Sequence, residues 1–180
     1  MPEIYVPLVT PPADRAEPAL WLAFRKGEVV VVRDGAQPTL PCCVDLAEHG
    51  LAPQRHHYLG LYAGRHCYAA EVGESVALPE GWAALGLRDL FGLVEATPAA
   101  PSGRAWQILE WERNFQYCSR CGSRMEPRAD ERSRTCPGCG FTSYPPVSPA
   151  IMILITHGRK LLLARKAAFR AGRYSALAGF

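Results

Sequence analysis

Two pairs of cysteines have the residue types and spacing of metal ligands. Cys118 and Cys121 form one Cys-x-x-Cys pair, Cys136 and Cys139 form the second, and 14 residues separate the pairs. Two residues between cysteines let a tight turn direct both sulfurs at one ion, and the glycine after each pair tolerates the positive φ that closes the turn. Four thiolates complete a tetrahedral zinc site and leave no open coordination position. The spacing therefore predicts a structural Zn²⁺ rather than one that activates water.

Two other interpretations of these cysteines are a thioredoxin-like redox pair and thiols packed without metal, and the duplicated spacing disfavours both. The segment is also rich in arginine, with Arg120, Arg124, Arg128, Arg132 and Arg134. Such a surface invites binding of DNA or RNA. However, no aromatic residue lies between Cys118 and Cys139 to stack on a base, which favours an ordinary solvated surface instead.

The elements before the cysteines have the pattern of a mixed α/β domain. The β-branched run 28–33 predicts a strand that ends at a hairpin turn, Asp34-Gly35. Segments 57–65 and 66–72 predict two more strands around a turn at Gly64, and 88–92 a short helix.

A longer helix is predicted directly before the first cysteine pair. The composition of residues 99–103 predicts a linker in which Ser102 caps a helix from about Arg104 to Phe115. One face of that helix is expected to pack in the core, and tryptophans 106 and 111 flank this face. The face consists of Ala105, Ile108, Leu109 and Glu112.

After the cysteines the chain continues as strands. The prolines within residues 144–149 forbid a continuing helix and favour an extended connection. Residues 150–156 form a nearly continuous apolar run, typical of a strand covered on both faces, and His157-Gly158 turns it into a second strand at 159–165. We expect these strands to open a new sheet.

Composition limits the classes of protein that fit. At 180 residues and 48% hydrophobic, the chain is long enough to bury a core. Its longest apolar run, at 151–155, is far below the roughly 20 residues of a membrane span, and its first residues do not have the pattern of a secretory signal. We therefore expect a cytoplasmic protein with no membrane partner. In that reducing compartment the paired cysteines favour metal over disulfides, whereas Cys42, Cys43 and Cys67 receive no chemical role.

The charge is divided unevenly along the chain. Residues 1–117 hold nine Lys and Arg against 14 Asp and Glu, whereas residues 118–180 hold eleven against three. A basic half suggests an anionic ligand such as a nucleotide phosphate, although zinc thiolates would remove part of the positive charge.

The order of these features resembles one family, the NADH pyrophosphatases of the Nudix superfamily, also described as NAD-capped RNA hydrolases. The resemblance rests on five segments: LRDL at 87–90, FQYCSRCG at 115–122, CPGC at 136–139, YPPVSPAI at 144–151 and LAGF at 177–180. It implies a homodimeric enzyme that hydrolyses the diphosphate of NADH or NAD to NMN(H) and AMP with Mg²⁺ or Mn²⁺. Removal of an NAD cap from RNA is a further implied activity.

The resemblance also implies residue roles. Arg88 and Glu131 correspond to substrate contacts, although Glu131 could equally be solvated ribbon surface. Tyr144 and Phe180 correspond to aromatics that sandwich the nicotinamide ring, one from each subunit; a tyrosine packed on Pro145 is the alternative for Tyr144. Ala178 corresponds to a position whose backbone carbonyl weakly helps to hold the catalytic metal.

The metal-binding glutamates of the family come from the Nudix box, which begins at the glycine of LAGF, and they are absent from these 180 residues. From Pro146 to Phe180 there are six cations and no Asp or Glu. A hard divalent cation needs oxygen ligands, mostly carboxylates and waters. We therefore expect a truncated form without hydrolase activity of its own.

The expected fold class is α+β in three parts. Residues 1–101 form a mixed α/β N-terminal domain, residues 102–145 a helix with a Cys₄ zinc ribbon, and residues 146–180 the first strands of an incomplete Nudix α/β/α sandwich. Two other functions stay open: a non-enzymatic zinc-ribbon module that binds RNA or protein, and a purely structural or dimerising fragment.

Overall fold

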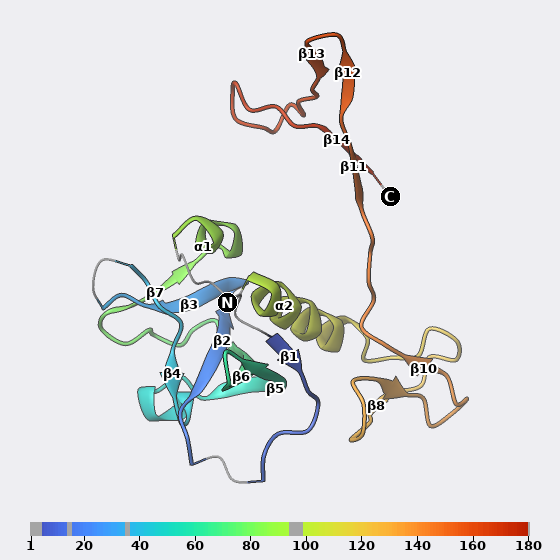
Figure 1. The fold of residues 1–180 in the computed structure, drawn as a ribbon. Helices are drawn as coiled ribbons and strands as arrows, with labels where there is room; N and C mark the ends of the chain where they lie inside the picture. Colours follow the sequence, from blue (N-terminus) through green and yellow to red (C-terminus); the bar gives the residue numbers. More distant parts are fainter. Residues whose placement is uncertain (1–4, 14–15, 35–36, 94–98, 180) are drawn as a thin grey trace. The chain divides into compact units, whose positions relative to one another are not determined.

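The computed structural model describes residues 5–13, 16–34, 37–93 and 99–179, which form two compact units (Figure 1). One unit runs from Met1 to Pro145 and the other from Pro146 to Phe180. The first contains the large sheet, both described α-helices and the cysteine segment. The second contains four short strands. This sheet-dominated content confirms the expected α+β class.

A seven-stranded mixed sheet forms the body of the first unit. Its order is β1-β5-β6-β2-β3-β7, with β4 paired to β2. Strands β2 and β6 are parallel and the other pairs are antiparallel. The strands are β1 (Tyr5–Pro7), β2 (Ala19–Arg25), β3 (Glu28–Val32), β4 (Cys42–Cys43), β5 (Pro53–Tyr62), β6 (Arg65–Val72) and β7 (Trp82–Leu85).

Three of these strands are the ones that the sequence predicts, β3, β5 and β6. The turn between β5 and β6 has positive φ at Ala63 (49°) and Gly64 (78°), as a two-residue hairpin turn requires. Strand β5 begins at Pro53, four residues before the predicted start. Of the turn predicted after β3, Gly35 lies outside the described residues.

Both faces of the sheet are buried at β2 and β3, which explains why these two strands are almost continuously apolar. Alternate residues along β2 and β3 point to opposite faces: Leu22, Phe24, Val29 and Val31 pack with the helices, and Trp21, Ala23 and Val30 pack on the other side. That other side is covered by the 3₁₀ helix η1 (Leu46–His49), which Asp45 caps by accepting a hydrogen bond from the backbone N–H of Ala47 at 2.9 Å.

The helices α1 (Leu87–Leu93) and α2 (Ala99–Asn114) lie on the first face. The apolar residues of the predicted α2 stripe are buried: Ala105, Ile108 and Leu109 are at most 2% exposed. The predicted linker at 99–103 is wrong, because α2 begins at Ala99 and Ser102 is buried within it. Pro101 tolerates this start, since the first helical turn needs no backbone N–H donors.

Three two-residue strands form the ribbon that follows α2. They are β8 (Glu126–Pro127), β9 (Arg134–Thr135) and β10 (Thr142–Ser143), in the order β10-β9-β8. Its small buried cluster consists of Cys118, Met125 and Cys136, with Cys139 and Phe141 packed against it. So small a cluster makes the metal the main expected source of stability.

The second unit consists of two antiparallel strand pairs, β11 (Ile151–Ile153) with β14 (Leu177–Gly179) and β12 (Ile155–His157) with β13 (Lys160–Leu162). The predicted hairpin at His157-Gly158 is present, and Leu154 divides the predicted first strand into β11 and β12. Every residue of these four strands is exposed. No helix among the described residues is long and apolar enough to cross a membrane.

Candidate metal centre and adjoining polar site

The fold brings the four paired cysteines together. Their sulfur atoms all lie within 4.8 Å of one another, with 3.6 Å between those of Cys118 and Cys139 and 3.4 Å between those of Cys121 and Cys136. Four sulfurs at the usual zinc–sulfur length of about 2.3 Å would be about 3.8 Å apart in a tetrahedron. The donor set and spacing therefore fit a tetrahedral zinc ion.

The two halves of the site are the same turn built twice. In the first, the N–H of Cys118 donates to the carbonyl of Ser123 at 2.8 Å, and the N–H of Gly122 donates to the carbonyl of Cys118 at 2.9 Å. In the second, the N–H of Cys136 donates to the carbonyl of Phe141 at 2.8 Å, and the N–H of Gly140 donates to the carbonyl of Cys136 at 2.9 Å. Both glycines have the predicted positive φ, 77° and 72°.

The surroundings of Cys121 favour the thiolate form that binds metal. Hydrogen bonds from the side chain and backbone of Ser123 lower the pKa of Cys121 to about 6. The backbone N–H of Arg120 lies 3.4 Å from the sulfur of Cys118. Because Cys118 and Cys136 are at most 4% exposed, metal bound there is shielded on one side. The cysteine cluster supports a structural Zn²⁺.

Arginine side chains fasten the ribbon to the sheet domain. Arg132 donates to the backbone carbonyl of Tyr58 at 2.5 Å and to that of Leu8 at 3.2 Å. Its burial lowers the pKa of its guanidinium group. Arg134, whose side chain is 8% exposed, donates to the carbonyl of Met125 and lies 3.6 Å from the carboxylate of Glu112 on α2.

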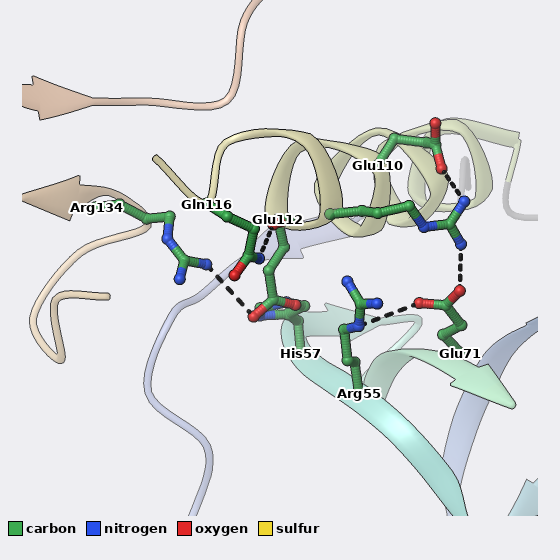
Figure 2. A network of polar contacts seen from close by, with 8 residues as sticks. Arg55, His57, Glu71, Glu110, Glu112, Gln116 and Arg134 are labelled. Carbon is green, nitrogen blue, oxygen red and sulfur yellow. Dashed lines mark hydrogen bonds and ion pairs between the residues drawn. The ribbon is translucent and has the colours of Figure 1, made fainter. Parts of the chain in front are cut away.

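Glu112 is the centre of a polar network between α2, β5 and the ribbon (Figure 2). Its second carboxylate oxygen is 2.6 Å from Nε2 of His57. The hydrogen bond with His57, helped by the charge of Arg134, keeps the pKa of Glu112 below its usual range. Glu71 on β6 extends the polar contacts by pairing with Arg55 and Arg113. The sequence patterns did not predict this network.

A second polar group lies at the end of the ribbon. The hydroxyl of Tyr144 donates to both carboxylate oxygens of Glu131, at 3.1 and 3.3 Å, and this bond raises the pKa of Tyr144. Ser133 donates to the same carboxylate at 2.9 Å, and Arg128 lies 3.4 Å from it. Glu131 also lines a pocket of about 170 Å³ with Arg132 and His57. The carboxylate is thus held in position rather than freely solvated.

The other predicted contact residues are Arg88, Ala178 and Phe180. Arg88 is exposed on α1 and is not among the contacts of Glu131 or Tyr144. Ala178 lies in β14 of the second unit, opposite Met152 of β11. Phe180 lies outside the described residues. Of the predicted substrate contacts that the structure describes, Glu131 and Tyr144 lie together.

The sheet, the α2 helix and the four-cysteine centre define a protein in which a zinc ribbon is fastened to a mixed α+β domain. Residues 18–111 match the model of the NADH pyrophosphatase-like rudimentary NUDIX domain, and residues 113–144 match that of the NADH pyrophosphatase zinc ribbon domain. The chain therefore belongs to the NADH pyrophosphatase family of the Nudix superfamily, which confirms the resemblance seen in the sequence.

Individual relatives agree with this assignment. The chain is 34% identical to the NAD-capped RNA hydrolase NudC of Chromobacterium violaceum, over 91% of this chain and 58% of the relative. The protein of the same name from Deinococcus radiodurans is 33% identical over 92% of this chain and 57% of its own length. The protein of the same name from Pseudomonas aeruginosa is 39% identical over 75% of this chain and 45% of its own length. The chain thus spans about half the length of the curated relatives it matches.

Proposed function

We propose that this chain serves the hydrolysis of the diphosphate bond in NADH or NAD, including NAD at the 5′ end of RNA, with NMN(H) and AMP as products. Its family membership and the names of its relatives support this activity. The observation that carries the proposal is the pairing of Tyr144 with Glu131 at the end of the ribbon. These are two of the residues to which the family resemblance assigns substrate contacts.

In this proposal the ribbon presents part of the nicotinamide site. The hydroxyl of Tyr144 is tied to Glu131, yet the tyrosine is 56% exposed, so its ring can still stack on a flat ligand. Arg88 is a further proposed contact. Phe180 of a second copy supplies the opposite aromatic, so the proposal includes a homodimer. The cytoplasm suits this role, because a reducing compartment keeps four zinc thiolates intact.

Mg²⁺ or Mn²⁺ belongs to the proposal as the ion that neutralises the diphosphate. The residues described here do not fit such an ion by themselves. Between residues 146 and 179 the chain offers the backbone carbonyl of Ala178 but no carboxylate, and these ions prefer several oxygen ligands.

The 180-residue polypeptide, purified with its zinc, is expected to release no AMP from NADH in the presence of Mg²⁺ or Mn²⁺. The segment that carries Ala178, residues 146–180, contains no Asp or Glu, and such an ion needs several oxygen ligands. Chromatography of the reaction products measures AMP directly. AMP formation that persists across independent preparations would show that other residues hold the catalytic metal.

Substituting Tyr144 tests the proposed nicotinamide contact. We expect Tyr144→Ala to weaken NADH binding by about tenfold or more, because stacking of an aromatic side chain on a base is typically worth about 1–3 kcal/mol. Tyr144→Phe is the matched control: it keeps the ring, loses only the hydrogen bond to Glu131, and is expected to bind almost normally. Quenching of nicotinamide fluorescence measures both affinities. Equal loss in both variants would assign the role to the hydrogen bond instead of the ring.

The same titration separates the enzyme proposal from a non-enzymatic module. A chain that binds RNA or protein through its ribbon, with no nicotinamide site, would leave NADH fluorescence unchanged at every concentration. A chain that binds neither NADH nor RNA would favour a structural role.

A further inference from the structure

The structure divides the five ribbon arginines into two groups. Three are committed to internal contacts: Arg128 pairs with Asp130 and Glu131, Arg132 donates to backbone carbonyls, and Arg134 pairs with Glu112. The other two, Arg120 and Arg124, are exposed on the first cysteine turn. Neither forms an ion pair with any part of the chain that the structure describes. Their guanidinium groups are available to an external anion.

Each of these two arginines has an aromatic neighbour. Arg124 lies directly opposite Tyr117 in an antiparallel bridge, so the two side chains are on the same side of the turn. The guanidinium carbon of Arg120 lies 5.7 Å from the ring centroid of Phe141, within the range of a cation–π contact. Tyr117 is 66% exposed. We call these four residues, Tyr117, Arg120, Arg124 and Phe141, the knuckle face.

This arrangement removes the sequence argument against nucleic acid. Along the chain, no aromatic lies between the first and last cysteines. Folding brings in one aromatic from just before the first cysteine and one from just after the last, at positions 117 and 141. The zinc-held turn then gives them a fixed backbone.

We propose that the knuckle face binds single-stranded RNA, with Arg120 and Arg124 on phosphates and Tyr117 stacked on a base. Single-strand binders combine cations with exposed aromatic rings, here Arg120 and Arg124 with Tyr117, because phosphate attraction and base stacking then act on neighbouring nucleotides. The inference rests on the proposed function, in which NAD is joined to an RNA, and it assigns to the ribbon the RNA body beyond the cap.

A second role for Arg120 and Arg124 competes with RNA binding. Four thiolates and one Zn²⁺ leave a formal charge of minus two, which Arg120 and Arg124 could balance without contacting any ligand. This role predicts that their removal loosens zinc and leaves RNA affinity unchanged.

Anisotropy titrations of a fluorescein-labelled, uncapped single-stranded RNA against the 180-residue chain test the proposal. We expect the double variant R120A/R124A to bind about tenfold more weakly at low salt. The slope of log affinity against log salt is expected to become shallower by about 1.4, since each single-strand phosphate contact contributes about 0.7. Y117A is expected to weaken binding by about tenfold with an unchanged slope, because stacking carries no charge.

The matched control is R159A/K160A, which removes two exposed cations from the β12–β13 hairpin of the second unit. It is expected to bind RNA normally. An equal loss in this control would show general charge attraction and would overturn the proposal. Unchanged RNA binding in R120A/R124A, or a zinc content below one ion per chain in that variant, would overturn it as well.

NADH fluorescence, measured on the same proteins, keeps the two proposals separate. Normal NADH binding with no RNA binding would reject the knuckle face and leave the proposed enzyme function intact. The chain could instead bind RNA through Arg120 and Arg124 without binding NADH. This result would reject the nicotinamide site, and it would also reject the assignment of the bound RNA to a capped substrate.

Discussion

Removing zinc from the native chain is expected to unfold residues 116–143 and to leave the seven-stranded sheet folded. The ribbon has only three two-residue strands and a buried cluster of three residues, two of which are metal ligands. The sheet has buried clusters on both of its faces. Zinc contributes on the order of 10 kcal/mol or more of apparent folding free energy in small modules, far more than so small a cluster can replace.

Hydrogen exchange with and without a strong chelator measures this effect along the chain. Backbone amides of the ribbon, such as those of Gly122 and Gly140, are expected to lose protection, while those of β2 and β6 keep it. Elemental analysis is expected to find one zinc ion per natively purified chain. A ribbon that keeps its protection after zinc removal would support thiols packed without metal.

Two cysteine variants provide the matched comparison. Cys136→Ser removes a ligand that is 1% exposed and is expected to reproduce the zinc-free exchange pattern. Cys42→Ser alters an exposed thiol on β4 and is expected to change neither zinc content nor ribbon protection. An equal effect of both variants would point to a general role of thiols in folding rather than to the four-sulfur site.

The metal centre could be predicted from the sequence because its geometry is local. Each half is one turn, fixed by two cysteines and a following glycine, and only the meeting of the two halves needs tertiary structure. The strands β3, β5 and β6 were recognisable for a similar reason, since β-branched residues and a two-residue turn act over a few positions. Such signals do not depend on what packs against them.

The features that the sequence did not reveal depend on distant partners. The start of α2 was placed at Arg104 because residues 99–103 have the composition of a linker, but burial of Ser102 in the domain overrides that local preference. The pairing of Tyr144 with Glu131 spans β9 and β10, whose registers were not predictable. The two aromatics of the knuckle face, Tyr117 and Phe141, likewise lie outside the segment from Cys118 to Cys139.

The polar contact of Glu112 could have been predicted from the sequence. The helical pattern places it on the same face as Ala105, Ile108 and Leu109, which are all buried. A carboxylate on a buried face requires a partner, because charged side chains are almost never buried unpaired. That conflict signals a polar contact at the end of α2, although only the structure identifies His57 and Arg134 as the partners.

The Glu112 contacts lead to a large expected effect on stability. We expect Glu112→Gln to lower the free energy of unfolding by about 2–3 kcal/mol at neutral pH, since it removes a charge-assisted bond and leaves the buried Arg134 without its carboxylate partner. Urea denaturation followed by tryptophan fluorescence measures the loss. Glu110→Gln is the control from the same helix: it alters an ion pair with Arg113 at i,i+3 and is expected to cost about 0.3–0.5 kcal/mol.

The pH dependence of this loss identifies its cause. Because the pKa of Glu112 is lower in the folded chain than its ordinary value of about 4.3, the carboxylate stabilises the fold fully above that value. The contribution disappears as pH falls through the lowered folded pKa, where the protonated carboxyl resembles the amide of the variant. The stability difference between wild type and Glu112→Gln is therefore expected to be fully present at pH 5 and to shrink below about 4. Because release of zinc would unfold the ribbon that carries Arg134 and would itself reduce the difference, only pH values at which one zinc ion per chain is still bound are compared. A difference that stays constant down to pH 3 would assign the loss to altered packing of α2 instead of to the charge of Glu112.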